Sequence, residues 1–511
     1  MDMQAAVVPL VTDHRRRLVL FLFLMTAMFM ATLDNQIVAT ALPTIVGEFG
    51  HLERFSWVGS AYLLAVSAVM PLYGKLGDLF GRKYVMMAAI LIFTVGSAVC
   101  GLAVSMNTLI AARVLQGLGG GGIMVSIFAV NADLFEPRER ARYQSYSSLV
   151  LMASGAIGPV LGGAMSDLFG WRSIFLVNVP IGVVVFAGLI FMLPYRKPHR
   201  RPKIDYAGAL LLALTTTSVV LAADSSELFG SLVSVPALSI IAVGVLCAVL
   251  WVLVERRAAE PIIPLQLFRN STFGLMLVMS IMSGAIGIGM VNYFALFLQT
   301  TTGLSPSSAG GLFVLLTGGI VCGSLSAGRI IAATGRYKPF AVASLACSAL
   351  AFAMLTQVHA GTSVFVIGAI MAFHGLGVGL AQQVPVIGVQ NAAPARDVGA
   401  ATGSVTLSRM GGASIAISIY GAIVASQLGR HGTSISGIAD IEQLTPKMMA
   451  ALPEAAREAV ADAYAGAFTP LFMTSCVIAL IGLAAALMLK PVQLPRAGEV
   501  KQPKPAAEAA E

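Results

Sequence analysis

The sequence has few charged residues and no segment that is long and polar enough to form a separate soluble domain. Asp, Glu, Lys and Arg make up 11% of its 511 residues, whereas they make up about a quarter of a typical soluble domain. Hydrophobic residues account for 57% of the chain, and its mean hydropathy is +0.85. This composition excludes an ordinary soluble domain and predicts an all-α protein that crosses a lipid bilayer many times.

Motifs for metals and catalysis are missing as well. The five cysteines stand singly within apolar segments and form no CxxC pair: Cys100, Cys247, Cys322, Cys347 and Cys476. The chain contains no HExxH, no GxSxG and no Asp-rich metal motif. We therefore expect no metal and no cofactor, and an intramembrane enzyme is disfavoured.

The basic residues lie mainly between apolar segments. We count fourteen of these segments, at 18–42, 56–74, 84–105, 107–132, 143–166, 172–193, 206–223, 236–254, 273–299, 307–333, 339–358, 362–388, 399–426 and 467–489. With the N-terminus on the inner side, the inner loops carry 25 of the 32 Lys and Arg residues. The positive-inside rule therefore predicts that both termini are cytoplasmic. The same rule explains the basic run at 194–205, so the net charge of +8 does not indicate a nucleic-acid partner.

A faint internal repeat suggests how the segments are grouped. GKLGDLFGRK at 74–83 and GRIIAATGRYK at 328–338 both have a Gly followed seven residues later by Gly-Arg, but Ala332 stands where the first copy has Asp78. This repeat predicts two pseudo-symmetric six-helix halves with an inserted central helix pair. The expected parts are an N-terminus at 1–17, a first half at 18–193, a basic inner loop and inserted helices at 194–272, a second half at 273–489 with an outer loop at 427–466, and a cytoplasmic tail at 490–511.

Two opposite charges are expected inside the membrane. Asp34 interrupts the first apolar segment and Arg113 the fourth. A helical rise of ~1.5 Å per residue places them ~13 Å and ~9 Å below the outer surface. Similar depth predicts an ion pair that controls whether Asp34 holds a proton. A static salt bridge between helices is the alternative, and Arg113 as the anchor of an anionic substrate is a third.

Other polar residues on apolar segments are candidates for a substrate cavity: Gln36, Tyr62, Asn292, Tyr293, Gln299, His374 and Arg409. A lone His among glycines is more often a hydrogen-bonded core residue than a proton site. Arg409 lies deep enough in its segment to need a partner, which the sequence does not identify.

Two glycine-containing motifs complete the candidates. We predict an inner latch made of Gly74, Gly77, Asp78, Gly81, Arg82 and Lys83. Its acid would lie at a helix N-terminus or pair with basic residues such as Arg138, Arg140 and Arg142; the alternative is a basic turn without further function. Small residues in the fifth segment predict close packing against another helix, beside a proline that softens the helix: Gly155, Gly158, Pro159, Gly162 and Gly163. The run GLGGGGI at 117–123 likewise predicts a thin face, meaning a helix surface with hardly any side chains, on the fourth segment.

These motifs resemble those of a known family. GKLGDLFGRK is similar to the signature inner loop of the major facilitator superfamily, ARVLQGLGGG to its helix-four motif, and SGAIGPVLGG to the helix-five motif of its antiporters. ATLDNQIVATALPTI and GWRSIFLVNVPIG resemble the branch of fourteen-helix drug:proton antiporters. Two departures are Gln36, where many members have Thr, and the missing acid at Ala332.

The resemblance implies a multi-pass exporter of the bacterial inner membrane, which exchanges lipophilic, often cationic compounds for protons by alternating access. It implies that Asp34 and Arg113 serve coupling and that the loop at 74–83 latches one state. The expected transport unit is a monomer in the bilayer that binds small substrates and is driven by a proton gradient. The sequence does not decide whether a periplasmic adaptor also binds it. The alternatives are a dedicated exporter of one lipid, siderophore or amino acid, and a sensor that does not transport.

Overall fold

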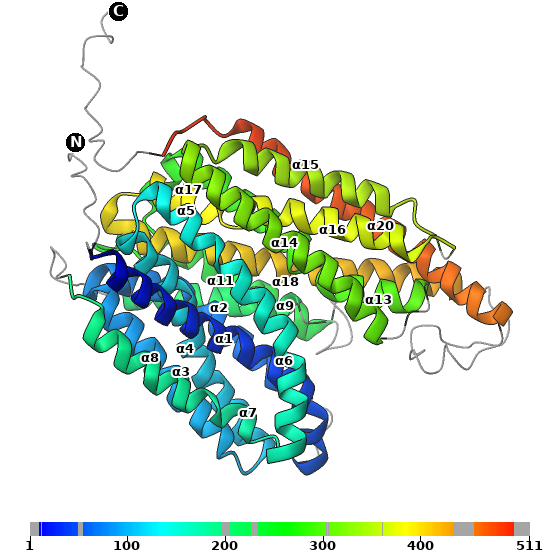
Figure 1. Cartoon of the computed structure of the whole chain (residues 1–511), viewed down its shortest axis with the longest axis horizontal. Coiled ribbons are helices and arrows are strands. Elements are labelled where there is room, and N and C mark those ends of the chain that lie inside the picture. The colour runs from blue at the N-terminus through cyan, green and yellow to red at the C-terminus, as the bar shows by residue number, and fades with distance from the viewer. Residues whose placement is uncertain are drawn as a thin grey trace, which may run out of the picture.

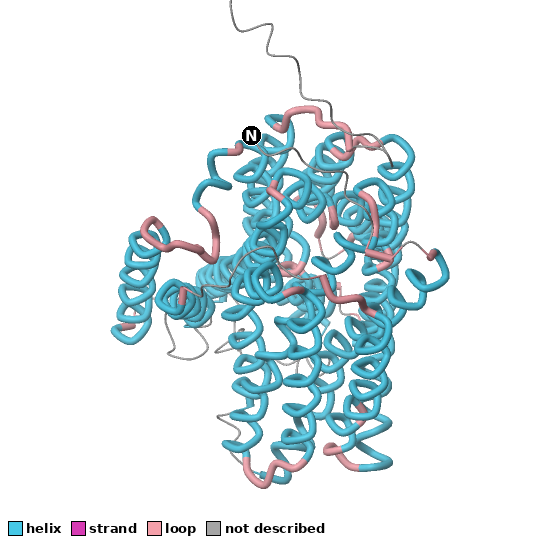
Figure 2. Tube along the Cα trace, turned by 90° about the vertical axis from the view of Figure 1, so that its left-hand side faces the viewer, coloured by secondary structure: helices cyan, strands magenta, loops and turns pink. Residues whose placement is uncertain are grey.

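The computed structural model describes residues 10–11, 13–49, 55–196, 205–223, 225, 234–302, 304, 306–359, 361–432 and 454–494. All secondary-structure elements named in these ranges are α- or 3₁₀-helices, which confirms the all-α prediction (Figure 2). Most of the predicted basic loop at 194–205 and the middle of the predicted outer loop at 427–466 lie outside the described residues.

The helices form two bundles and a separate pair (Figure 1). The N-terminal bundle contains α1 (His14–Phe49), α2 (Phe55–Phe80), α3 (Arg82–Gly101), α4 (Met106–Leu134), α5 (Pro137–Ser145), α6 (Ser147–Phe169), α7 (Ser173–Leu176) and α8 (Asn178–Met192). The pair is α9 (Tyr206–Ala223) and α11 (Val235–Glu255). The C-terminal bundle contains η2 (Leu265–Arg269), α12 (Ser271–Gly287), α13 (Val291–Thr301), α14 (Pro306–Thr334), α15 (Lys338–Leu355), α16 (Val364–Ala381), α17 (Val384–Ala392), η3 (Ala395–Asp397), α18 (Val398–Gly432) and α20 (Glu454–Met488).

Eleven helices of the described chain are long and apolar enough to span a membrane, or twelve when one bent pair is counted as a single span. They match eleven of the fourteen predicted segments. The other three segments are helical but less regular: 143–166 is bent by 44° between Gly155 and Val160, within α6, 206–223 forms a shorter apolar helix, and 273–299 is divided into α12 and α13. A total of fourteen spans stays a prediction.

Several helices extend beyond the apolar segments that predicted them. α1 continues past the expected end at 42 to Phe49, and residues 74–80, expected in a loop, form the last turns of α2. α2 ends because Gly81 adopts a φ of 92°, which an L side chain rarely takes, and Gly335 ends α14 with a φ of 72°. The two motif copies therefore share a helix-ending glycine, as their spacing suggests.

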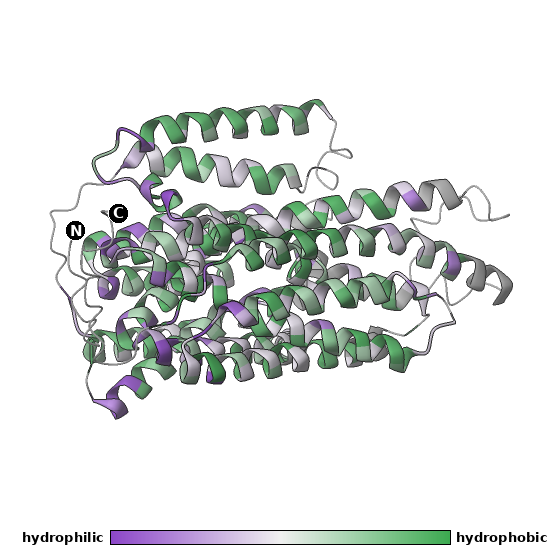
Figure 3. Cartoon of the chain, turned by 90° about the horizontal axis from the view of Figure 1, so that it is seen from above, coloured by the Kyte–Doolittle hydropathy of each residue, from purple (hydrophilic) through white to green (hydrophobic). Residues whose placement is uncertain are grey.

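The two bundles lie close together at one end of the molecule and diverge toward the other (Figure 1). The described chain begins and ends at the closed end, where Leu10 donates to the carbonyl of Asp133 and Leu494 to that of Gly335. Hydrophilic residues gather at this end in the hydropathy view (Figure 3). We call this the basic end, defined by Asp78, Arg82, Arg138 and Arg140. The predicted inserted pair stands to one side in Figure 3, where α9 contacts both α2 and α18.

The glycine run of α4 allows three helices to pack closely. A Cβ atom on Gly121 would lie 2.5 Å from the carbonyl oxygen of Val66 in α2, and one on Gly119 would overlap the backbone of Phe93 in α3. Because backbone atoms cannot move aside as a flexible side chain can, α4 needs glycine on both faces. The predicted thin face is confirmed, and it brings Arg113 of α4 close to α1, α2 and α3.

We predict that Gly119→Ala destabilises the N-terminal bundle, because the added methyl group would overlap the backbone of α3. Overpacking of this kind costs about 1–3 kcal/mol. The thermal unfolding midpoint of the purified protein should therefore fall. Gly59→Ala in α2 is the matched control, since a Cβ there meets no atom within 4 Å; an equal fall in both variants would contradict the packing argument.

Candidate functional site

Asp34 of α1 and Arg113 of α4 form an ion pair inside the N-terminal bundle. The Asp34 Oδ2 atom lies 2.5 Å from the Nη1 atom of Arg113, and both side chains are fully buried. The pairing expected from their depths is therefore confirmed. Removing one member of such a pair leaves an uncompensated buried charge, at a cost of about 3–5 kcal/mol.

Two amide side chains complete the surroundings of the carboxylate. The Oδ1 atom of Asp34 accepts hydrogen bonds from Gln116 Nε2 at 2.8 Å and from Asn178 Nδ2 at 2.9 Å. Both amides also donate to the hydroxyl of Ser97, at 2.9 and 3.0 Å, and that hydroxyl donates to the carbonyl of Phe175. Helices α4 and α8 thus supply polar partners for one acid on α1, and α3 supplies the hydroxyl that both amides share.

The sequence analysis did not select these three residues, although each has a local signal. Gln116 follows Arg113 by three residues, so both lie on the same face of α4. Ser97 and Asn178 are polar residues in apolar surroundings, and all three side chains are buried. Buried polar groups need partners, so these positions could have been assigned to a network, but their common partner could not.

The guanidinium of Arg113 is held by further contacts. Its Nε atom donates to the carbonyl of Val58 at 3.1 Å, and its Cζ atom lies 4.2 Å from the centre of the Tyr62 ring. This is a cation–π geometry, and the Tyr62 hydroxyl donates to the carbonyl of Ala31 at 3.3 Å. Tyr62, a candidate for the substrate cavity, is therefore buried against the ion pair in this conformation.

The acid is sealed from solvent in this conformation. Asp34 is 1% exposed and Arg113 is 0% exposed. Protons and substrates therefore cannot reach the carboxylate unless the surrounding helices move apart.

The glycines of α6 only partly match their prediction. A Cβ on Gly158 would lie 2.5 Å from the Cβ of Gln36, so this glycine does permit close packing of α6 against α1. Added Cβ atoms on Gly155 and Gly163 would meet nothing within 4 Å, so the predicted close packing is wrong at these two positions. Gly162 is buried, and the Pro159 side chain lies outside the described part of the structure.

The remaining cavity candidates are spread over the molecule. Gln36 is exposed on α1, whereas Tyr293 of α13 donates a hydrogen bond to the carbonyl of Ile417 at 2.7 Å. His374 is buried between the rings of Phe294 and Phe352, with its Nε2 atom 3.3 Å from the carbonyl of Ile286.

Arg409 of α18 donates to the carbonyl of Gln382 at 2.5 Å, at the break between α16 and α17. This carbonyl is a partner that the sequence could not identify. The side chains of Asn292 and Gln299 lie outside the described part of the structure.

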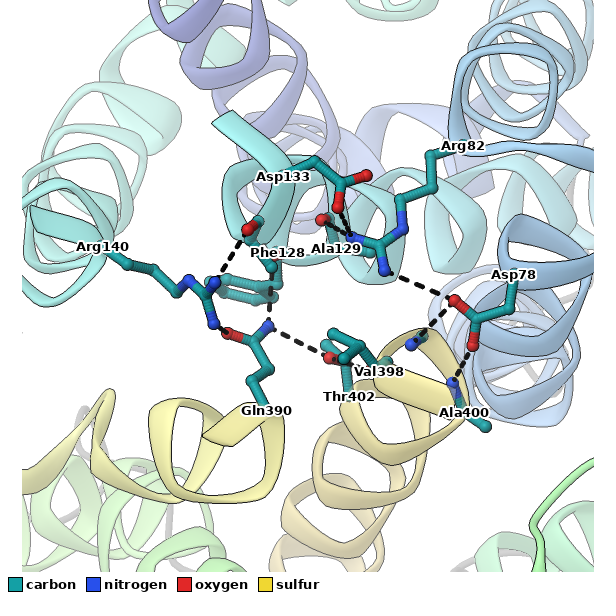
Figure 4. Close-up of polar contacts among 12 residues, drawn as sticks. Asp78, Arg82, Phe128, Ala129, Asp133, Arg140, Gln390, Val398, Ala400 and Thr402 are labelled. Carbon is teal, nitrogen blue, oxygen red and sulfur yellow. Dashed lines mark hydrogen bonds and ion pairs between the residues drawn. The ribbon is translucent and has the colours of Figure 1, made fainter. Parts of the chain in front are cut away.

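At the basic end, Asp78 caps a helix of the opposite bundle (Figure 4). Its carboxylate accepts hydrogen bonds from the backbone N–H groups of Gly399 at 3.1 Å and Ala400 at 3.0 Å, in the first turn of α18. The positive end of the helix dipole and unpaired N–H groups favour an anion at this place. Of the two options weighed for Asp78, the structure has the helix N-terminus.

The rest of the latch motif orients this acid. Arg82 lies 3.4 Å from Asp78 and 3.0 Å from Asp133, and it also donates to the carbonyl of Ala129 (Figure 4). The backbone of Gly74 contacts that of Gly399, an approach that a side chain on either residue would prevent. Lys83 donates to the carbonyl of Ile190 at 2.7 Å.

Gln390 of α17 forms a second polar connection between the bundles, which the sequence analysis did not predict. Its Oε1 atom accepts from Arg140 and from Gln144, each at 3.3 Å. Its Nε2 atom donates to the carbonyl of Phe128 at 3.2 Å and to the hydroxyl of Thr402 at 3.1 Å (Figure 4). One buried amide thus connects α4 and α5 with the C-terminal bundle.

Further contacts between the bundles lie at the same end. Arg138 donates to the carbonyls of Leu494 at 2.9 Å and Ala333 at 3.3 Å. The hydroxyl of Ser148 donates to that of Ser324 at 2.8 Å. Arg138 and Arg140, two of the three basic residues expected near Asp78, thus contact the other bundle rather than the latch acid, whereas Arg142 hydrogen-bonds with Tyr146 of its own bundle. The basic end is closed.

Comparisons with known proteins agree with this architecture. A sequence profile described as "Major Facilitator Superfamily" matches residues 24–417. An uncharacterized MFS-type transporter of Mycobacterium tuberculosis is 33% identical over 492 residues, which cover 95% of this chain and 71% of that protein. Multidrug resistance protein 3 of Bacillus subtilis is 29% identical over 497 residues, covering 93% of this chain and 96% of that protein.

Solved transporters share the fold at low sequence identity. The human organic anion transporter MFSD10 aligns with a TM-score of 0.60 and 15% identity, over 92% of this chain and all of that one. The proton:xylose symporter XylE aligns with a TM-score of 0.61 and 13% identity, over 93% of this chain and 95% of that one. The profile match and the relatives show that this chain belongs to the Major Facilitator Superfamily of membrane transporters.

Proposed function

We propose that this protein exports lipophilic, cationic compounds across the bacterial cytoplasmic membrane in exchange for protons. The observation that carries the proposal is the buried ion pair of Asp34 and Arg113. Ionisable groups in the membrane region are rare and often mark the path of a proton or substrate. Multidrug resistance protein 3 and the multidrug transporter protein MdtP, both of Bacillus subtilis, support export of drugs as the activity.

In the proposed orientation, the basic end faces the cytoplasm and both termini lie there, as the positive-inside rule favours. The conformation described is then closed toward the cytoplasm. Two sets of contacts must break before substrate can enter from inside: the cap that Asp78 of α2 forms on α18, and the hydrogen bonds of Gln390. The proposed transport unit is a single chain. A proton gradient supplies the energy for export, and no cofactor takes part in the proposal.

The charge balance of the pair suggests how the exchange is coupled. While Asp34 is ionised, it neutralises Arg113, and the carboxylate can attract a cationic substrate. When Asp34 takes up a proton from outside, Arg113 becomes an uncompensated cation that repels the substrate. Proton and cationic substrate thus exclude each other, and a membrane potential adds ~2.3 kcal/mol per charge per 100 mV.

We predict that Asp34→Asn abolishes proton-driven export, because an amide has no titratable proton and cannot neutralise Arg113. Ethidium efflux from vesicles with an imposed pH gradient should fall to the level of protein-free vesicles. Glu48→Gln is the control, since Glu48 is an exposed carboxylate on the same helix, paired with Arg172 at the opposite end from the latch. Wild-type efflux by the Asp34 variant would overturn the mechanism.

Opening of the basic end gives a second prediction. Asp78→Asn together with Gln390→Leu removes the helix cap and the amide connection between the bundles, so the closed population should decrease. Glu139→Cys and Ala333→Cys in a cysteine-free background provide sites for two spin labels. The distribution of the distance between these labels should then shift to longer values. Asp462→Asn, an exposed carboxylate on α20, should leave the distribution unchanged; an unchanged distribution in the double variant would show that these contacts do not hold the end closed.

Substrate breadth separates export of many drugs from export of one physiological solute. We predict that chemically unrelated lipophilic cations, such as ethidium and tetraphenylphosphonium, inhibit each other's efflux. A dedicated carrier for a lipid, siderophore or amino acid would reject most of them. Efflux of one compound measured against increasing amounts of the other provides the test.

A further inference from the structure

The hydrogen bonds around Asp34 suit only one of its two protonation states. Arg113 donates to Oδ2, while Gln116 and Asn178 donate to Oδ1. Three donors satisfy an ionised carboxylate, which is an acceptor only. A protonated acid also carries an O–H donor, and this donor needs an acceptor in a site that water does not reach.

Most oxygen atoms near the acid are already occupied. Gln116 Oε1 accepts from Arg113 at 2.7 Å and from the Cys100 thiol at 3.6 Å. The hydroxyl oxygen of Ser97 already accepts from Gln116 and Asn178 while its own proton goes to the carbonyl of Phe175. Asn178 Oδ1 differs, because it is buried and has no hydrogen-bond partner in the described part of the chain.

An asparagine amide can exchange the places of its oxygen and nitrogen by a half-turn of the planar group, with almost no change of shape. In Asn178 this turn would bring Oδ1 to the place of Nδ2, which lies 2.9 Å from Asp34 Oδ1. The oxygen would then accept the proton of the acid. Ser97 lies 3.0 Å from the same place, and its hydroxyl can rotate to donate to the turned amide.

We propose that Asn178 is a positioning residue for Asp34, whose amide donates to the ionised carboxylate and reverses to accept a hydrogen bond from the protonated acid. The proposal rests on the proposed function, since it requires Asp34 to gain and lose a proton. The ionisable groups that face the acid are Arg113 from α4, Tyr62 from α2 and, through Gln116, Cys100 from α3; α8 contributes the neutral Asn178.

Gln116 serves a different purpose in this scheme. Its Oε1 atom accepts a hydrogen bond from Arg113, so a half-turn of its amide would place the donor Nε2 against the guanidinium, which is also a donor. Gln116 therefore keeps its orientation in both states, and the reversible contact belongs to Asn178. This division allows proton uptake without an unpaired hydroxyl in an apolar site.

Infrared difference spectroscopy of the reconstituted protein across pH tests the proposal. The carbonyl stretch of a protonated carboxyl group reports both proton occupancy and hydrogen bonding, and the band that Asp34→Asn removes belongs to Asp34. In Asn178→Leu this band should move to higher wavenumber, because the acid has lost its acceptor. The pH at which the band has half of its full intensity should also rise by about one unit, a tenfold change in proton affinity. Loss of the amide destabilises the ionised acid more than the protonated one, because a hydrogen bond to a charged group is stronger than one to a neutral group.

The matched control is Asn131→Leu, which removes a fully buried amide of α4 far from Asp34 and should leave the band and its pH dependence as in wild type. If Asn178→Leu does not fold, Asn178→Ala removes the same amide without overpacking, and the same upward shifts are expected.

The outcomes distinguish the two proposals. An Asp34 band that neither Asn178 variant alters would overturn the role of Asn178 and leave proton coupling in place. A wild-type spectrum without any band that depends on Asp34 would overturn both. An altered band with wild-type behaviour of Asn131→Leu supports the reversible amide.

Discussion

A buried ion pair between two helices constrains the whole N-terminal bundle. Asp34 and Arg113 meet at 2.5 Å with no exposed surface, and a charge in this apolar environment is tolerated only when it is paired and hydrogen-bonded. To satisfy both groups, α1, α2, α3, α4 and α8 must approach one point. The glycines of α4 make this possible, because they let α4 contact the backbones of α2 and α3. Packing and electrostatics therefore depend on each other here.

A second carboxylate performs a related task between the bundles. Asp78 accepts two backbone hydrogen bonds at the start of α18, so its charge is stabilised by a helix end in addition to its ion pair with Arg82. Helix capping of this kind can be lost when the bundles separate, since the acid keeps Arg82 as a partner on its own side. The buried pair keeps one bundle together, whereas the latch and Gln390 join bundles that a transporter must separate.

Much of the architecture could be predicted from the chain alone. Eleven of the fourteen apolar segments became helices of spanning length, and the ion pair followed from helical rise, because depth along a helix is a local property. The packing predicted for the α6 glycines was less successful, because a Cβ on Gly155 or Gly163 would meet nothing within 4 Å. Tyr62 and His374 are buried in this conformation, and their place in a substrate cavity stays a prediction.

The sequence by itself determined a multi-helix membrane protein with an acid and an arginine at matching depth, because hydropathy and helical rise depend only on neighbouring residues. Only the tertiary structure decided which partners surround each charge. Gln116 and Asn178 reach Asp34 from two helices and share Ser97 of a third, and Asp78 reaches backbone groups more than 300 residues away in α18. Such contacts depend on how each helix is rotated and which helix lies beside it, and these are set by packing across the whole chain.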